Sequence, residues 1–254
     1  MKKFFWLFLG VFCIAGGEIK AEIFKINYFS PEETKLVAKD KTSHQLLWQS
    51  VLKLEKVTER GRETAHSVET GGGFYGKNRK NLNWIFEADY IFDGGQLVPA
   101  KAKFLFKDKA GTVIRRLEKT YDFNTRRVLC YLDGKKQEFF LRPDLVGTEF
   151  IGTFMANYPF EEKRDFIFYL LTNEPTVYKM TLKFRGTEVI QAAGREISCY
   201  KIEMIPDLGA LGIFGAFVPK TYFWLEKAAP HKFVRYEGLE SGLGTPYIVE
   251  EIAQ

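Results

Sequence analysis

Side chains able to perform metal or acid–base chemistry are few in this sequence and widely spaced. Its three histidines, His44, His66 and His231, form no H-x-x-x-H pair, and no Cys-x-x-Cys pair accompanies them. Zinc sites need closely grouped N or S ligands, because several of them must meet one ion. The sequence therefore predicts no metal site, and each histidine is expected at the surface or in a turn.

Hydrolytic chemistry has little support. Residues 238–242 read G-x-x-S-G, which differs from the G-x-S-x-G nucleophile elbow and lies between two predicted strands. Glu87 and Asp89 share one face of a predicted strand whose other face is aromatic, a pairing that suits glycoside chemistry. The alternative is that both carboxylates point to water. We predict no catalytic residue, no cofactor and a non-enzymatic protein.

An apolar, glycine-rich stretch at residues 206–219 is the best candidate for a binding site. Glycine favours a loop, whereas large apolar side chains favour burial or contact with an apolar molecule. We expect the stretch to form a lip over a sheet and bind an acyl chain. The alternative is a buried connection that packs against a helix. The predicted ligand-binding residues are Leu208, Leu211, Ile213, Phe214 and Phe217, together with Trp224, Phe154 and Tyr158.

The first 21 residues have the pattern of a secretory signal peptide. Met1-Lys2-Lys3 precedes an apolar run at residues 4–15 and an A-x-A-like end at Ala21. The run is too short to span a bilayer, so we expect cleavage near Ala21 and a periplasmic or secreted protein without a stable membrane span. The formal net charge is only +5, with lysines and glutamates interspersed. This charge pattern does not indicate a nucleic-acid partner.

Two cysteines, Cys130 and Cys199, follow the predicted signal peptide. In an oxidising compartment an even pair is compatible with one disulfide bridge. Cys130 alternates with Val128 and Leu132 on an apolar face, whereas Cys199 alternates with charged residues. Two buried free thiols are therefore the alternative.

The spacing of apolar residues predicts a mainly β protein. Alternation recurs along most of the chain, as in the inward row Trp84, Phe86, Ala88, Tyr90 and Phe92. Residues 144–158 instead have apolar side chains at helical spacing and predict an amphipathic helix. We expect a large curved antiparallel sheet, a half-barrel, that wraps this helix in a single domain at residues 22–254. Two packed halves, residues 22–142 and 143–254, are the alternative.

Three local predictions complete this description. The capping-box pattern at residues 30–33 predicts a short helix to about residue 38. Residues 71–81, rich in glycine and followed by basic side chains, predict a mobile hairpin loop. Residues 166–171 are apolar on both faces, which is typical of a central strand covered on both sides.

The second half of the chain resembles a family of uncharacterised bacterial periplasmic proteins classed as a domain of unknown function. The resemblance is carried by Asp144-Leu145, residues 194–199 (GREISC), residues 220–225 (KTYFWL), residues 229–231 (APH) and residues 234–238 (VRYEG). That family is similar to the lipoprotein carriers LolA and LolB, in which a curved sheet holds acyl chains on its concave face. The resemblance implies binding of a lipid or lipidated protein, and it supplies no catalytic residues.

These observations favour a protein that binds an apolar ligand, such as a lipid, an acyl chain or a lipoprotein, in the concave face of the sheet. One alternative is a structural or assembly factor of the cell envelope that docks a protein partner. A second alternative is a carbohydrate-active enzyme that uses Glu87 and Asp89.

Overall fold

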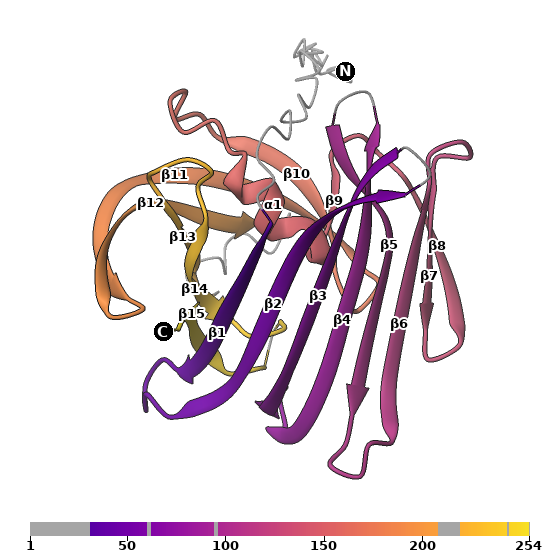
Figure 1. Ribbon diagram of the computed structural model, residues 1–254, viewed down its shortest axis with the longest axis horizontal. Helices are drawn as coiled ribbons and strands as arrows, with labels where there is room; N and C mark the ends of the chain where they lie inside the picture. Colours follow the sequence, from indigo (N-terminus) through magenta and orange to yellow (C-terminus); the bar gives the residue numbers. More distant parts are fainter. Residues whose placement is uncertain (1–30, 60–61, 94–95, 208–218, 243, 254) are drawn as a thin grey trace, which may run out of the picture.

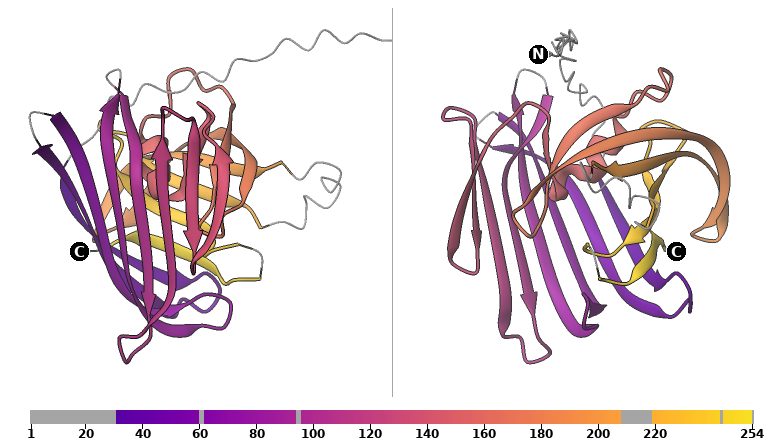
Figure 2. Two further views of the ribbon diagram at one scale, coloured as in Figure 1. Left: turned by 90° about the vertical axis from the view of Figure 1, so that its right-hand side faces the viewer. Right: turned by 180° about the vertical axis from the view of Figure 1, so that it is seen from behind.

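The computed structural model describes residues 31–59, 62–93, 96–207, 219–242 and 244–253. They form one open, curved sheet of 15 strands with a single short helix, α1, inside the curve (Figures 1 and 2). The prediction of a mainly β protein built on a large curved sheet is confirmed. In the first half of the chain the strands are β1 Glu32–Asp40, β2 Leu46–Glu59, β3 Arg62–Tyr75, β4 Lys80–Asp93, β5 Gln96–Lys107, β6 Val113–Asp122, β7 Arg127–Leu132 and β8 Lys135–Phe140.

The second half of the chain completes the sheet from its other edge. Its elements are β9 Leu145–Gly147, the 3-10 helix η1 Thr148–Phe150, α1 Ile151–Ala156, β10 Phe166–Leu171, β11 Val177–Ala192, β12 Arg195–Pro206, β13 Thr221–Glu226, β14 Phe233–Leu239 and β15 Tyr247–Ile252. The strands β1 to β8 run outward from β1 to one edge. The strands β9 to β15 run back from the opposite edge to β1, where β15 pairs with β1.

All neighbouring strands are antiparallel except β9 and β10, which are parallel. Alternation decides which side chains face the concave side, since successive residues of a strand point to opposite faces. The predicted inward row on β4 is confirmed at Trp84, Ala88 and Tyr90, which are buried. Ala102 and Phe104 on β5 are buried beside them, opposite exposed lysines.

The helix is much shorter than predicted. Residues 145–147 form the extended strand β9, whose Leu145 and Val146 are buried against β10, and α1 has only six residues. The apolar residues have helical spacing, but residues 145–147 pair with β10 as a strand and therefore do not form the first turn of the helix. The side chains Phe150, Phe154 and Met155 are buried in the main core, so α1 fills one end of the concave face.

Three local expectations were wrong. Residues 32–40 form β1, which lies between β2 and β15, because two neighbouring strands offer hydrogen bonds that outweigh a capping box. Residues 71–75 belong to β3, so the turn to β4 is confined to residues 76–79. The strand β10 lies next to the edge strand β9, and Ile167 is exposed on its outer face.

Gly71 in β3 leaves room for the ring of Trp84 on the concave face, and Gly73 lets β3 lie close to the backbone of β2. A Cβ atom on Gly71 would lie 2.4 Å from the ring of Trp84 and 2.7 Å from the Cβ of Ser50. A Cβ on Gly73, which has a φ of +145°, would lie 2.4 Å from the carbonyl oxygen of Leu47. Glycine in the middle of this strand therefore serves close packing.

Replacing Gly71 with alanine is expected to destabilise the protein by about 1–3 kcal/mol, because the added methyl group overpacks the site. Urea denaturation monitored by circular dichroism would measure the change. Gly152 is the matched control, since nothing lies within 4 Å of a Cβ placed there in α1. Gly152→Ala is expected to be neutral or to stabilise by up to about 1 kcal/mol. Equal effects of the two substitutions would contradict the packing argument.

Candidate functional site

The predicted ligand-binding residues do not form one site in the structure. Leu208, Leu211, Ile213, Phe214 and Phe217 lie outside the described residues, as does the predicted signal peptide at residues 1–21. Phe154 and Tyr158 are buried together in the main core, where Phe154 packs against Phe168 with ring centroids 5.1 Å apart. These two side chains are core residues that hold α1 and the chain after it against the sheet.

Trp224 lies on the opposite face of β13 from Phe223 and Leu225, which belong to the main core. It packs in a separate small cluster with Cys199 and Val234. Its Nε1 donates a hydrogen bond to Glu188 at 2.9 Å. Trp224 is therefore separated by the sheet from the concave face to which it was assigned.

The two cysteines are free and buried, and the disulfide considered for them is absent from the structure. Cys130 belongs to the main core on the concave face, whereas Cys199 lies in the separate cluster on the other face. Burial raises the pKa of both thiols to about 11. Because the sheet lies between them, the two thiols cannot form a bridge. Of the two alternatives, a disulfide and two buried free thiols, the structure contains the second.

Glu87 and Asp89 point away from the concave face. Glu87 pairs with Lys103 at 3.7 Å, and Asp89 pairs with His66 at 2.7 Å. Each is at least 40% exposed at its side chain. The aromatic row of β4 lies on the other side of the same strand, so these carboxylates and those rings do not line one surface.

The second apolar cluster of the concave face was not predicted as a site. It lies beyond the helix-filled end, on β1 to β5, β14 and β15. The cluster consists of buried side chains and of other apolar side chains that pack against them but keep part of their surface exposed. The buried members are Leu36, Ala38, Leu47, Trp48, Leu82, Trp84, Phe106 and Ile248, and the partly exposed ones are Leu52, Tyr75, Phe86, Phe233, Tyr236 and Ile252.

Three glutamates lie among these apolar side chains. Trp48 Nε1 donates a hydrogen bond to Glu240 Oε1 at 2.8 Å, and the Gly76 backbone N–H donates to Glu240 Oε2 at 2.6 Å. Trp84 Nε1 donates to Glu69 Oε1 at 3.3 Å. Glu250 lies on β15 in register with Tyr236 of β14. We call the surface formed by Glu69, Glu240, Glu250, Ser50, Trp48, Trp84, Tyr75 and Tyr236 the inner acidic surface.

Burial shapes the protonation of the inner acidic surface. Desolvation, together with the neighbouring charges of Glu69 and Glu240, raises the pKa of Glu250 to about 8. Burial also raises the pKa of Glu69 and of Glu240, although the tryptophan hydrogen bonds oppose this effect. Each glutamate nevertheless retains part of its surface exposed. Carboxyl groups surrounded by protein but still accessible can meet a ligand.

The sequence contained a signal for this surface. Glu250 alternates with Ile248 and Ile252, so a carboxylate occupies an inward position of its strand. Lys119 does the same on β6, between Leu117 and Tyr121. A charged side chain in the apolar phase of a strand indicates either a buried ion pair or a functional group.

Lys119 belongs to a buried ion pair at the helix-filled end. Its Nζ lies 2.7 Å from Glu149 Oε2 and also contacts Thr148, Asn173 and the carbonyl oxygen of Leu171 at 3.3 Å each. The hydroxyl of Tyr121 donates to Glu149, and that of Tyr90 donates to the Glu149 carbonyl oxygen at 2.7 Å. Both charges are fully satisfied, so this network positions β6 against η1.

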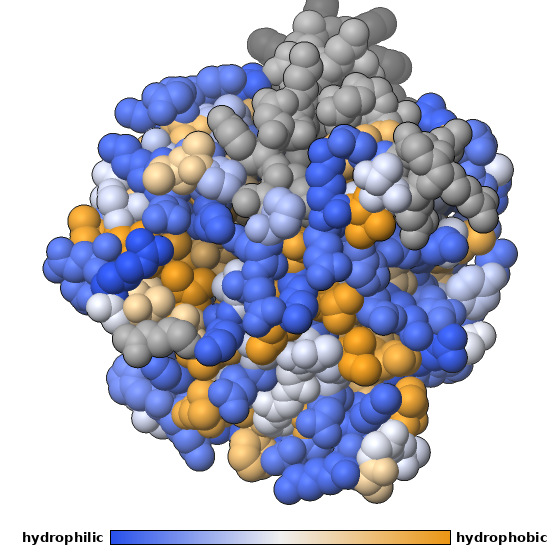
Figure 3. Space-filling view, viewed as in Figure 1, coloured by the Kyte–Doolittle hydropathy of each residue, from blue (hydrophilic) through white to orange (hydrophobic). Residues whose placement is uncertain are grey.

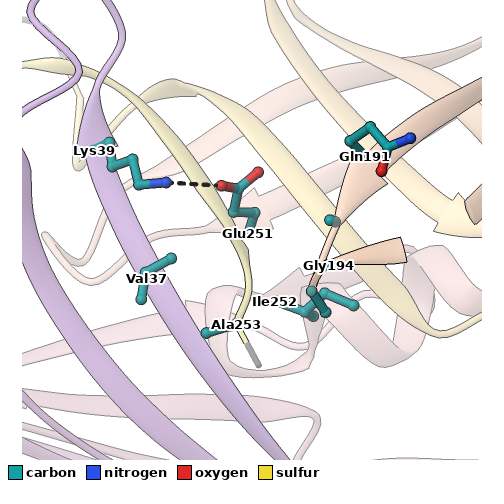
Figure 4. A pocket seen from close by; sticks show the side chains of 9 residues that line it. Val37, Lys39, Gln191, Gly194, Glu251, Ile252 and Ala253 are labelled. Atoms are coloured by element: carbon teal, nitrogen blue, oxygen red, sulfur yellow. Dashed lines mark hydrogen bonds and ion pairs between the residues drawn. The ribbon is translucent and has the colours of Figure 1, made fainter. Parts of the chain in front are cut away.

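A separate open pocket lies on the other face of the sheet, where β1 and β15 meet the turn between β11 and β12 (Figure 4). Its volume is about 390 Å³. Lys39 Nζ lies 3.2 Å from Glu251, which also pairs with Arg235 at 2.7 Å. These charges are paired with each other, so the pocket does not favour one class of ligand.

The outer surface is mixed in character. In the view of Figure 3, hydrophobic residues appear in small groups among hydrophilic ones. Within the described ranges, no group of three His, Cys, Asp or Glu side chains is placed to hold a metal ion. The same part of the chain has no helix long and apolar enough to cross a membrane.

The described residues define a mainly β protein with one large open, curved sheet. A β-barrel-like protein of the domain of unknown function DUF1849 from Brucella abortus shares this fold with a TM-score of 0.55 and 7% sequence identity, over 88% of this chain and 96% of that protein. No protein-family model and no curated protein matches the sequence.

Two further solved structures match with lower TM-scores. A putative exported protein with a YmcC-like fold from Bacteroides fragilis gives 0.33 at 12% identity, over 89% of this chain and 97% of that one. The hypothetical lipoprotein YmcC from Escherichia coli gives 0.31 at 11% identity, over 91% and 92%. At such low identity the comparison with the Brucella protein shows a shared fold alone.

Proposed function

We propose that this chain is an exported, non-enzymatic protein that binds an apolar chain, such as the acyl chain of a lipid or lipoprotein, on the concave face of its sheet. The observation that carries the proposal is the second apolar cluster. Phe86, Tyr75 and Tyr236 keep part of their surface exposed there, although they point to the inside of a curved sheet. Large aromatic side chains in such a position favour an apolar ligand.

Two further points support the proposal. The helix α1 lies at one end of the concave face, and the long strands β2 to β5 extend beyond it (Figure 1). The signal-peptide pattern at residues 1–21 supports export. The family that the second half of the chain resembles is similar to LolA and LolB, which supports a lipid as the ligand. The site now proposed is the second apolar cluster, whereas residues 208–218 of the predicted lip lie outside the described residues.

Tryptophan fluorescence tests this proposal directly. Trp48 and Trp84 lie in the proposed site, Trp224 lies on the other face, and Trp6 belongs to the segment that we propose is removed on export. A fatty alcohol with a terminal bromine atom quenches tryptophan at short range. The Trp224→Phe variant, which keeps the two site tryptophans, is expected to show saturable quenching.

The complementary variant, Trp48→Phe with Trp84→Phe, keeps Trp224 and is expected to show little quenching. Circular dichroism would verify that both variants fold. Absence of saturable quenching in Trp224→Phe would refute the proposal, and so would equal quenching of the two variants. Native mass spectrometry of the purified protein would then show whether a lipid co-purifies and would give its mass.

A further inference from the structure

The three glutamates of the inner acidic surface lack a positive counter-charge. Among the described residues, no lysine or arginine forms an ion pair with Glu69, Glu240 or Glu250. Arg79, in the turn between β3 and β4, lowers the pKa of Glu240, but its guanidinium pairs with Asp40 at 2.6 Å. Where these groups are ionised, carboxylates without a counter-charge are costly among apolar side chains. A ligand that brings a positive charge would remove this cost.

Ser50 is a second, independent sign of a missing partner. Its residue is only 5% exposed, and its Cβ faces Gly71 and Trp84 on the concave face. Burial raises the pKa of Glu69, and an interaction with the Ser50 hydroxyl opposes part of this rise. Ser50 Oγ nevertheless has no hydrogen-bond partner of good geometry in the described part of the chain. A buried hydroxyl without a partner is rare, and this one points toward the carboxylate side of the surface.

The rings around the glutamates suit a cation. Trp48 and Trp84 meet edge to face with centroids 5.5 Å apart, and Tyr75 lies 5.6 Å from Trp84. The faces of tryptophan and tyrosine attract ammonium groups through their quadrupoles. Carboxylates beside such rings add direct charge attraction.

A bare metal ion does not suit this arrangement. Metal ligands must converge on one point, and no three acidic, histidine or cysteine side chains in the described ranges do so. Carboxylates spread over β3, β15 and the end of β14 match a larger, organic cation. The apolar side chains beside them match a chain attached to that cation.

We propose that the inner acidic surface binds the ammonium group of an amphipathic molecule, whose apolar chain lies along the second apolar cluster. This inference rests on the proposed function and specifies the class of ligand. It predicts selection against fatty acids, because a carboxylate head group would be repelled by the glutamates. The three carboxyl groups and the partly exposed Tyr75 contact the head group, and the buried side chains of Trp48, Trp84 and Ser50 lie behind them.

Binding of a permanent cation should depend on pH. The groups that face Glu250 are Glu69 and Tyr75 from β3, Tyr236 from β14 and Glu240 just after it, with Arg79 at the edge. A cation binds more tightly to an ionised carboxylate than to a neutral carboxyl. Because the pKa of Glu250 is about 8, affinity should rise between pH 6 and pH 8 and then level off.

The experiment compares three probes of equal chain length in displacing the brominated alcohol, each used below its micelle concentration or, for the neutral alcohol, below its solubility limit. They are dodecyltrimethylammonium, dodecanol and dodecanoate. At pH 8.5 the ammonium probe is expected to bind at least about tenfold more tightly than dodecanol, and dodecanoate should bind least. The variant Glu69→Gln with Glu250→Gln should lose this preference and still bind dodecanol. Glu87→Gln, on the other face, should keep it.

The outcomes separate the two proposals. Equal binding of the ammonium probe and dodecanol would overturn the inference while leaving the proposed function intact. If the brominated alcohol did not bind, or if none of the three probes displaced it, both the inference and the proposed function would be overturned. Retention of the preference in the double glutamine variant, with folding verified by circular dichroism, would assign cation selection to other residues and also overturn the inference.

Discussion

Replacing Lys119 with methionine is expected to destabilise the protein by about 3–5 kcal/mol, the usual consequence of leaving one member of a buried ion pair without its partner. The carboxylate of Glu149 would remain buried, with side-chain exposure of 3%, and it would keep the hydrogen bond from the hydroxyl of Tyr121. Urea denaturation at pH 7 would measure the loss. Glu149→Gln is also expected to lower the free energy of unfolding, because Lys119 would then be the unpaired buried charge.

The double variant Lys119→Met with Glu149→Gln should be more stable than the sum of the single losses predicts, since no unpaired charge remains. An exposed pair on the outer face provides the control. Lys103 and Glu87 are each 40% exposed at their side chains, and breaking this pair should change stability by no more than about 1 kcal/mol. Comparable losses at the two pairs would show that burial does not govern the effect.

Replacing Glu250 with glutamine is expected to stabilise the protein by several kcal/mol at pH 9 and to change little at pH 4. The folded protein holds the Glu250 proton up to about pH 8, whereas the unfolded chain loses it near the ordinary glutamate value of 4.5. Over that window the unfolding free energy of the wild type falls as pH rises, by up to about 1.4 kcal/mol per pH unit from this group. Glutamine does not titrate, so the variant lacks this fall.

Denaturation of both proteins at several pH values between 4 and 9 would test this. The difference between them should grow from pH 4.5 to pH 8 and remain constant above it. Glu87→Gln is the control and should give no comparable trend. A difference that does not vary with pH would show that Glu250 is not desolvated. If the gain in stability accompanies loss of ammonium selectivity, Glu250 is retained for binding at the expense of stability.

Local sequence patterns predicted most of the strands, because alternation is a property of each strand by itself. The inward row of β4 and the outward lysines of β5 follow from the two-residue period. The same reasoning failed where another strand competed for the backbone. Residues 32–40 have a capping box but pair on both sides with β2 and β15, and residues 145–147 pair with β10 before α1 begins.

The candidate site was harder to predict, because its parts lie far apart in the chain. Attention to apolar residues selected Phe154 and Tyr158, which are core, and Trp224, which faces the other side of the sheet. Glu250 and Lys119 were not predicted as site residues, although each occupies an inward position between two apolar side chains of its strand. The two have different roles, since Lys119 has a carboxylate partner and Glu250 has none among the described residues.

The sequence by itself determined the β class, the inward and outward faces of most strands, and the presence of a helix within residues 144–158, although not its length, since these depend on neighbouring residues. Only the tertiary structure decided that β15 pairs with β1, which brings Glu250 beside Glu69 and Glu240. Pairing between the two ends of the chain depends on how the whole sheet curves, and no local pattern encodes it. The inner acidic surface, and the chemistry proposed for it, exist because of that one pairing.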